Sequence, residues 1–208
     1  MSSFTQFLAA LAYLVTIAVA FPASITPRAS GGSSCPEANT TARVYASALY
    51  TLFPDEPQEA SQAVPDFHVQ YNNQTGLNIQ QAIIFGGFPK EATGCAFGWA
   101  QDDAVNGVLV AGGDGLLTGR QLTGFPNVTQ GVSAAAVKPF DTAGADREFH
   151  PDFTSWDREI HATNHTSGPG MITCSEDIFL FFEKAPTTSG NVYLKKTEGS
   201  GLFIEYRC

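Results

Sequence analysis

Basic residues are scarce in this chain of 208 residues: 11 lysines and arginines stand against 20 aspartates and glutamates, for a formal net charge of −9. The basic residues also form no cluster along the sequence. Recognition of nucleic acids and of anionic membranes depends on such clusters, so we expect neither as a partner. An acidic, sparsely charged composition instead favours solubility, as in many secreted proteins.

Several motifs of enzymes and metal sites are missing as well. The sequence contains no G-x-S-x-G nucleophile motif, no GxxxxGK(S/T) phosphate loop and no CxxC pair. The acidic stretch that begins at Asp102 lacks the oxygen ligand that a calcium loop requires at its third position, where Ala104 stands. We therefore expect no catalytic residues, no cofactor and no metal ion.

Charge is absent altogether from the beginning of the chain. Met1–Ala20 has an apolar centre and ends in the small-x-small sequence Ala18-Val19-Ala20, which predicts a secretory signal peptide over residues 1–20. The apolar run is short for a membrane anchor, and the chain closes without the hydrophobic tail of a GPI anchor. Residues 21–34 are rich in Pro, Ser and Gly and are expected to be a flexible leader. We predict an extracellular protein with no membrane segment in its mature form.

Cysteines and glycosylation sequons support this compartment. An even number of cysteines in a secreted chain predicts two disulfides, with three connectivities open: the four are Cys35, Cys95, Cys174 and Cys208. Four Asn-x-Ser/Thr sequons predict a glycoprotein, with each asparagine on an exposed loop or strand edge: they are Asn39, Asn73, Asn127 and Asn164.

Short strands separated by turns make up most of residues 35–208. In Thr93–Ala100, Cys95 shares one face with two aromatic residues, which is typical of a disulfide in the core of a sandwich. Ile178–Glu183 is apolar on both faces and predicts a strand in the middle of a packed sheet. The final residues, Leu202–Cys208, also predict a strand, in which Leu202, Ile204, Tyr206 and Cys208 share one apolar face and the charged residues lie on the other. We predict one all-β domain over residues 35–208, an antiparallel β-sandwich with two disulfides.

Some segments are harder to assign. Arg43–Phe53 has alanines that permit a helix and β-branched and aromatic residues that favour a strand. Gly131–Phe153 is irregular and is expected to be a long loop over one end of the sandwich. We predict a strand at Trp156–Ile160 and another loop at His161–Gly170.

The spacing of cysteines and aromatic residues resembles a known fungal family. The chain has a Cys after a turn at Thr93-Gly94-Cys95, a later Trp156, an apolar strand after Cys174 and a Gly-Leu-x-Ile-x-Tyr-x-Cys ending. In these features, residues 35–208 resemble the C-terminal domain of the ubiquitin 3 binding protein But-two family. The resemblance implies a secreted, cysteine-bridged β protein of a filamentous fungus. A ubiquitin-like partner is not expected, because a secreted chain does not meet one.

For the disulfides we predict Cys95–Cys174 across the core, which leaves Cys35–Cys208 to join the two ends of the domain. Three classes of function follow. The first is a non-catalytic secreted or cell-wall-associated protein with a binding or structural role. The second is a carbohydrate-binding module or secreted effector, which would bind a polysaccharide or an extracellular protein through an aromatic platform of Trp156, Tyr71 and Tyr193. The third is a hydrolase or metal site built from His150, Asp152 and His161, although solvated surface explains these residues as well.

Overall fold

A computed structural model describes residues 34–102, 107–142, 144, 147–158, 163–166, 171–185 and 188–208. The predicted signal peptide, the predicted leader up to residue 33, and His161 lie outside these residues. The described strands are β1 (Ala42–Tyr45), β2 (Ala48–Leu52), β3 (Ala60–Ser61), β4 (Ala63–Val64), β5 (Phe67–Tyr71), β6 (Asn78–Gly86), β7 (Thr93–Gln101), β8 (Val108–Ala111), β9 (Leu117–Gln121), β10 (Val132–Ser133), β11 (Thr163–Thr166), β12 (Asp177–Lys184), β13 (Gly190–Leu194) and β14 (Gly201–Arg207).

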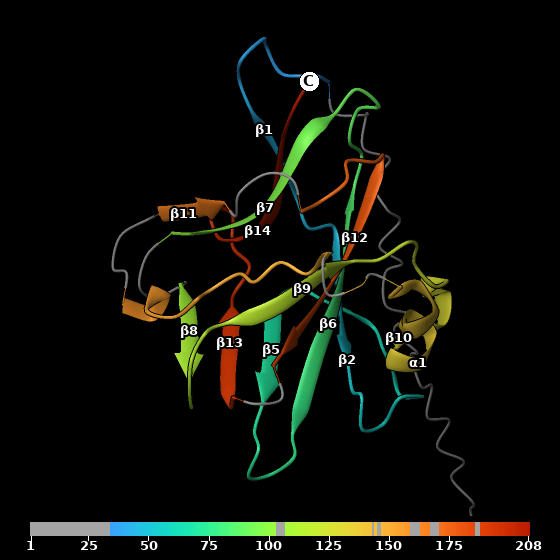
Figure 1. Ribbon diagram of the computed structural model, residues 1–208, viewed down its shortest axis with the longest axis vertical. Helices are drawn as coiled ribbons and strands as arrows, with labels where there is room; N and C mark the ends of the chain where they lie inside the picture. Colours follow the sequence, from blue (N-terminus) through green and yellow to red (C-terminus); the bar gives the residue numbers. More distant parts are fainter. Residues whose placement is uncertain are drawn as a thin grey trace, which may run out of the picture. The chain divides into compact units, whose positions relative to one another are not determined.

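Two principal sheets form an antiparallel β-sandwich, as predicted (Figure 1). The smaller has the order β1-β14-β7-β11, and the larger has the order β4-β2-β6-β5-β13-β8, with β12 paired to both β6 and β9. Side chains of the two sheets meet in a core in which Phe97 of β7 lies 4.9 Å from Phe182 of β12, measured between ring centroids. The ring of Phe67 on β5 packs against the same phenylalanine, with its centroid 5.5 Å from that of Phe182. The ambiguous segment Arg43–Phe53 forms strands β1 and β2.

The small residues of β7 allow a close approach on the outer face of the smaller sheet. Cys95, Phe97 and Trp99 are buried in the core, and Gly98 points the other way. A Cβ atom at Gly98 would lie 2.6 Å from the ring of Phe203 on the neighbouring strand β14. It would also lie 2.5 Å from the His165 carbonyl oxygen on β11, so the close packing of both neighbouring strands against β7 requires glycine at this position.

Two local predictions are wrong. Trp156–Arg158 is a 3-10 helix, η4, and not a strand. The turn before it explains the difference, because Ser155 has a φ of 72° and the Asp152 carboxylate accepts a hydrogen bond from the Thr154 N–H at 2.8 Å. The predicted loop His161–Gly170 contains strand β11, which pairs with β7 at the edge of the smaller sheet. An edge strand exposes its side chains, so its polar sequence carried no strand signal.

Residues 123–140 form a compact segment, here called the covering loop, over the outer face of the larger sheet (Figure 1). Its base is closed because the N–H and Oγ1 of Thr123 both donate to the Phe140 carbonyl, at 2.9 and 3.1 Å. It holds η1 (Val128–Gln130), β10, α1 (Ala134–Val137) and η2 (Lys138–Phe140). Its apolar side chains form a second core with the sheet, which contains Tyr50, Leu52, Ala82, Leu122, Val132, Val137 and Phe181. Part of the predicted long loop is therefore a packed layer.

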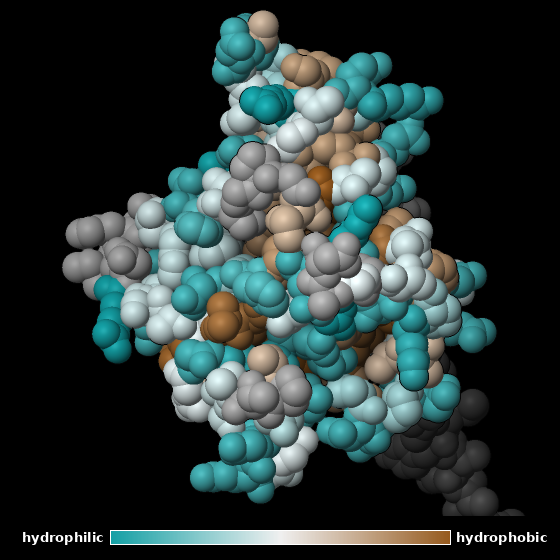
Figure 2. All heavy atoms as spheres, in the orientation of Figure 1, coloured by the Kyte–Doolittle hydropathy of each residue, from teal (hydrophilic) through white to brown (hydrophobic). Residues whose placement is uncertain are grey.

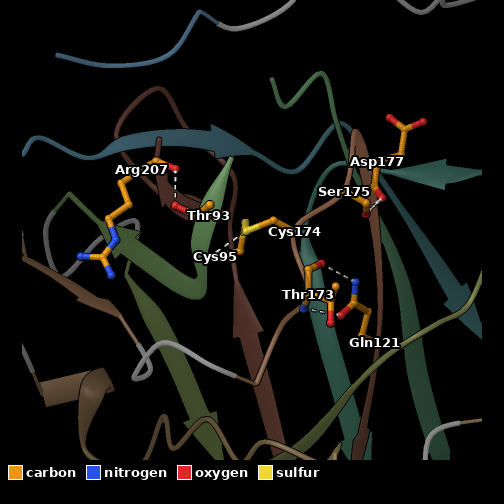
Figure 3. The surroundings of a disulfide bond; sticks show 8 residues. All are labelled: Thr93, Cys95, Gln121, Thr173, Cys174, Ser175, Asp177 and Arg207. Carbon is orange, nitrogen blue, oxygen red and sulfur yellow. Dashed lines mark hydrogen bonds between the residues drawn. A yellow bond between two sulfur atoms is a disulfide. The ribbon is translucent and has the colours of Figure 1, made fainter. Parts of the chain in front are cut away.

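Both predicted disulfides are confirmed. Cys35 joins Cys208 with 5.7 Å between Cα atoms, and Cys95 joins Cys174 with 5.5 Å. Figure 3 shows that the second bridge ties β7 to the segment before β12. That segment is also held by Thr173, which exchanges hydrogen bonds of 2.8 and 2.9 Å with the Gln121 side chain. On the face shown in Figure 2, hydrophilic residues predominate and hydrophobic residues form small separate groups.

Candidate functional site

A cavity of about 530 Å³, here called the Arg120 cleft, lies between the covering loop and the outer face of the larger sheet. Its apolar walls come from Leu52 and Phe181 of the sheet, from Pro54 and Pro57, and from Ala134, Ala135 and Val137 of α1. Its polar lining consists of Gln58, Gln80, Arg120, Lys138, Asp141 and Glu183. The cleft therefore combines hydrogen-bonding groups with apolar surface, as ligand sites commonly do.

Arg120 organises the polar side of the cleft. Strand β9 places its guanidinium, with the side chain 13% exposed, among three carboxylates. It reaches Asp141 at 2.9 Å, Glu148 at 3.2 Å and Glu183 at 2.6 Å. The guanidinium also lies 4.8 Å from the centroid of the Phe181 ring. Arginine suits this position because its planar fork presents five donors and stacks on aromatic faces.

The electrostatics of the cleft keep Arg120 charged. Burial alone would lower the pKa of its guanidinium, but hydrogen bonds to Asp141 and Glu183 outweigh burial and raise that pKa above its ordinary value. The lining holds two cationic side chains, Arg120 and Lys138, and two anionic ones, Asp141 and Glu183. The formal charges of these four lining side chains cancel, and Glu148, the third partner of Arg120, does not line the cleft. The lining therefore matches a ligand without net charge.

The carboxylates of the cleft are held as ion-pair partners of Arg120. Hydrolysis of a glycosidic bond requires one carboxylic acid and one carboxylate on opposite sides of the bond. Here Asp141 and Glu183 are both held by the same guanidinium, and the Gln80 amide donates to the second oxygen of Glu183 at 3.0 Å. Within the described residues, no cluster of three or more His, Cys, Asp and Glu side chains has the geometry of a metal site.

The predicted aromatic platform is divided between surfaces. Tyr193 of β13 pairs with His68, and Tyr71 of β5 pairs with Gly190, so the two tyrosines point to opposite faces of their sheet. Trp156 of η4 packs edge-on against the buried Trp99, with ring centroids 5.1 Å apart. The three residues therefore do not form one row.

Tyr193 has a defined polar partner. Its hydroxyl donates to the Asp66 carboxylate at 2.5 Å, and its ring lies 5.9 Å from that of His68. The hydrogen bond to Asp66 raises the pKa of Tyr193 to about 12. A phenol with a raised pKa stays protonated, so Tyr193 acts as a donor and not as a base.

The other predicted sites are described in part. His150 and Asp152 are exposed, and the carboxylate of Asp152 serves the turn before η4. All four sequon asparagines are exposed, as expected: Asn39, Asn73, Asn127 and Asn164. Asn127 accepts a hydrogen bond from Thr129 at the start of η1, and Asn164 accepts one from Arg43.

Sequence reasoning missed the Arg120 cleft. In the sequence, Glu183 only ends the predicted apolar strand Ile178–Glu183, but in the structure its carboxylate pairs with Arg120. The other members of the ion cluster, Asp141 and Glu148, come from segments with no regular pattern. One local signal was present, since Glu183 follows Phe179 and Phe181 on the outer face of β12. An apolar face that ends in a carboxylate indicates a covered face with a buried ion pair at its end.

Comparison of the chain with protein-family models, with curated proteins and with solved structures finds no match. In the part of the chain that the structure describes, no helix has the length and apolar character needed to cross a membrane. The fold and the Arg120 cleft are thus the observations from which a function can be inferred.

Proposed function

We propose that the protein is a secreted, non-catalytic fungal β-sandwich protein that binds a neutral, hydroxyl-rich ligand in the Arg120 cleft. The observation that carries the proposal is the composition of this cavity, whose lining combines balanced charges and amide groups with apolar side chains. A sugar ring presents hydroxyl groups at its edge and an apolar C–H surface on its faces. The ligand class that fits is a polysaccharide of the cell wall or of another extracellular surface.

Other observations support the extracellular part of the proposal. The two disulfides are compatible with an oxidising compartment. The pattern of residues 1–20 and the four sequons agree with passage through a secretory pathway. The resemblance to the But-two C-terminal domain family agrees with a fungal source.

The test is retention of the secreted protein on insoluble chitin, β-glucan, cellulose and xylan. Ala135→Trp would fill the cleft from α1, while Ala136→Trp adds the same side chain to a neighbouring position that does not line it. We expect retention on at least one polymer, a loss of about tenfold or more in affinity for Ala135→Trp, and little change for Ala136→Trp.

Two further measurements sharpen this experiment. Retention that Trp156→Ala abolishes and Ala135→Trp leaves intact would move the site to the predicted aromatic platform and contradict the cleft. Supernatants from the same tubes are assayed for soluble sugar, whose release would contradict a non-catalytic role. Absence of retention on every polymer would contradict the polysaccharide assignment.

A further inference from the structure

A second hollow, of about 540 Å³, lies at the end of β5 and β13 and is lined only by polar residues and glycine. Three loops form it: residues 72–74, residues 112–114 and residues 188–189. Such a lining offers hydroxyl, amide and carboxylate groups but no apolar side chain. It therefore suits a hydroxylated ligand and not an apolar one.

One of the lining residues is itself a sequon asparagine. Asn73 begins the sequence Asn73-Gln74-Thr75 and is exposed. Its side-chain Oδ1 accepts a hydrogen bond from Ser189 Oγ at 2.8 Å, and Ser189 Oγ accepts one from the Asn73 N–H at 3.0 Å. These bonds hold the amide at the wall of the hollow. They engage its oxygen and not Nδ2, the atom that carries an N-linked glycan.

The loops around the hollow also enclose a buried charge. The Lys184 ammonium, with its side chain fully buried, donates to the Asp114 carboxylate, to Thr188 Oγ1 at 3.0 Å and to the Leu116 carbonyl at 2.9 Å. Asp114 and Thr188 line the hollow as well. Anything that fills the hollow therefore covers the partly exposed side of this ion pair.

We propose that Asn73 carries an N-linked glycan whose first N-acetylglucosamine lies in this hollow and holds the three loops together over the Lys184–Asp114 pair. The hydroxyl and acetamido groups of that sugar match the polar lining. The inference rests on the secretory passage in the proposed function, but not on the Arg120 cleft. Asn127 and Asn164 also accept hydrogen bonds at Oδ1, from Thr129 and Arg43, but neither of these asparagines lines the hollow.

The test compares glycoforms of the protein secreted from yeast. Thr75→Ala removes the sequon and keeps Asn73, Thr75→Ser keeps the sequon, and Thr129→Ala removes the sequon at Asn127 as a matched control. Trimming with endoglycosidase H leaves a single N-acetylglucosamine on each site. Occupancy of Asn73 is read by mass spectrometry of its peptide.

We expect an occupied Asn73 and a melting temperature that is the same for the wild type, Thr75→Ser, Thr129→Ala and the trimmed protein. Thr75→Ala should melt about 2 to 4 °C lower. Its amide exchange should be faster in the three loops and unchanged in the covering loop. Unglycosylated wild type and Thr75→Ala made in bacteria should melt together, which separates loss of the glycan from loss of the hydroxyl.

An unoccupied Asn73 would overturn the proposal. Equal melting and exchange for secreted wild type and Thr75→Ala would overturn it too, as would destabilisation on trimming to one sugar. The retention experiment on insoluble polysaccharides tests the Arg120 cleft independently of this inference. A protein whose Asn73 glycan stabilises the loops but which binds no polysaccharide would contradict the proposed function and leave this inference standing.

Discussion

Lys184 has a charged group in a fully buried position at the end of β12. An ammonium there is tolerated because each of its three N–H donors has an oxygen partner: Asp114, Thr188 and the Leu116 carbonyl. The pKa of Asp114 is lowered mainly by the hydrogen bond from Lys184, so the carboxylate stays charged beside it. The pair joins the loop before β9 to the end of β12.

Removing this ammonium should destabilise the protein. We expect Lys184→Met to lower the free energy of unfolding by about 3 kcal/mol, at the low end for a broken buried pair because the Asp114 side chain is 39% exposed and gains water. Urea denaturation measures the change. The exposed Lys195→Met serves as the control and should stay within about 0.5 kcal/mol of the wild type. Equal effects of the two substitutions would show that Lys184 is hydrated.

The Tyr193 hydroxyl should lose its proton at a higher pH than an ordinary phenol. Its pKa of about 12, against the ordinary 10.0, means that the folded state favours the protonated form. The stability from the bond to Asp66 is therefore complete below pH 10 and is lost as the pH rises from 10 to 12. Absorbance titration of tyrosinate should show one late component that is missing in Tyr193→Phe. Asp66→Asn should move that component to lower pH, and an unchanged titration would contradict the hydrogen bond.

At the scale of single residues, the sequence predicts the core better than it predicts the candidate site. Cys95 was placed correctly because its aromatic neighbours mark a core face within one strand. Arg120 and its carboxylates come from separate segments, and no local spacing brings them together. Tyr71 and Tyr193 are platform candidates by their chemistry alone, and the strand register places them on opposite faces of the sheet.

Among the strands and loops too, the sequence predicts those with a local pattern and misses those whose structure depends on distant segments. β12 and β14 were predicted well because alternation of side chains is a local property of an extended chain. Strand β11 was missed because its pairing with β7 depends on a segment far away in the sequence. Residues 131–140 of the covering loop carry no regular pattern in the sequence, because the order of the loop comes from packing against Tyr50 and Phe181 of the sheet.

The covering loop depends on Arg120, which binds Asp141 directly after the loop ends. In Arg120→Met the three carboxylates would lose the guanidinium that binds them, and we expect a loss of about 3 to 5 kcal/mol in the free energy of unfolding. Hydrogen exchange should become faster in residues 123–141, while β7 and β14 stay protected. Arg120→Lys should restore only part of the protection, because an ammonium lacks the planar fork. Uniform acceleration across both sheets would mean that the loop is not a separate unit.

The two disulfides hold different parts of the molecule. Cys35–Cys208 joins the two ends of the described domain, and both residues are exposed. Cys95–Cys174 lies against the core, where Cys95 is 1% exposed. In the chain-entropy model, loops of these lengths each contribute about 4 to 5 kcal/mol, so the difference between the bridges lies in access and packing and not in loop length.

Mild reduction should therefore open Cys35–Cys208 first and leave a folded protein with one bridge. The last strand should remain paired, because β14 is hydrogen-bonded to β1 on one side and to β7 on the other and is not held by Cys208 alone. Thiol alkylation followed by peptide mapping identifies the first bridge to open, and thermal unfolding compares Cys35→Ser/Cys208→Ser with Cys95→Ser/Cys174→Ser. The second variant should be the less stable, because it also loses packing in the core. Earlier reduction of Cys95–Cys174 would contradict this order. It would mean that the sandwich opens around β7 before the ends of the domain fray, and that the core disulfide stabilises the region that opens most readily.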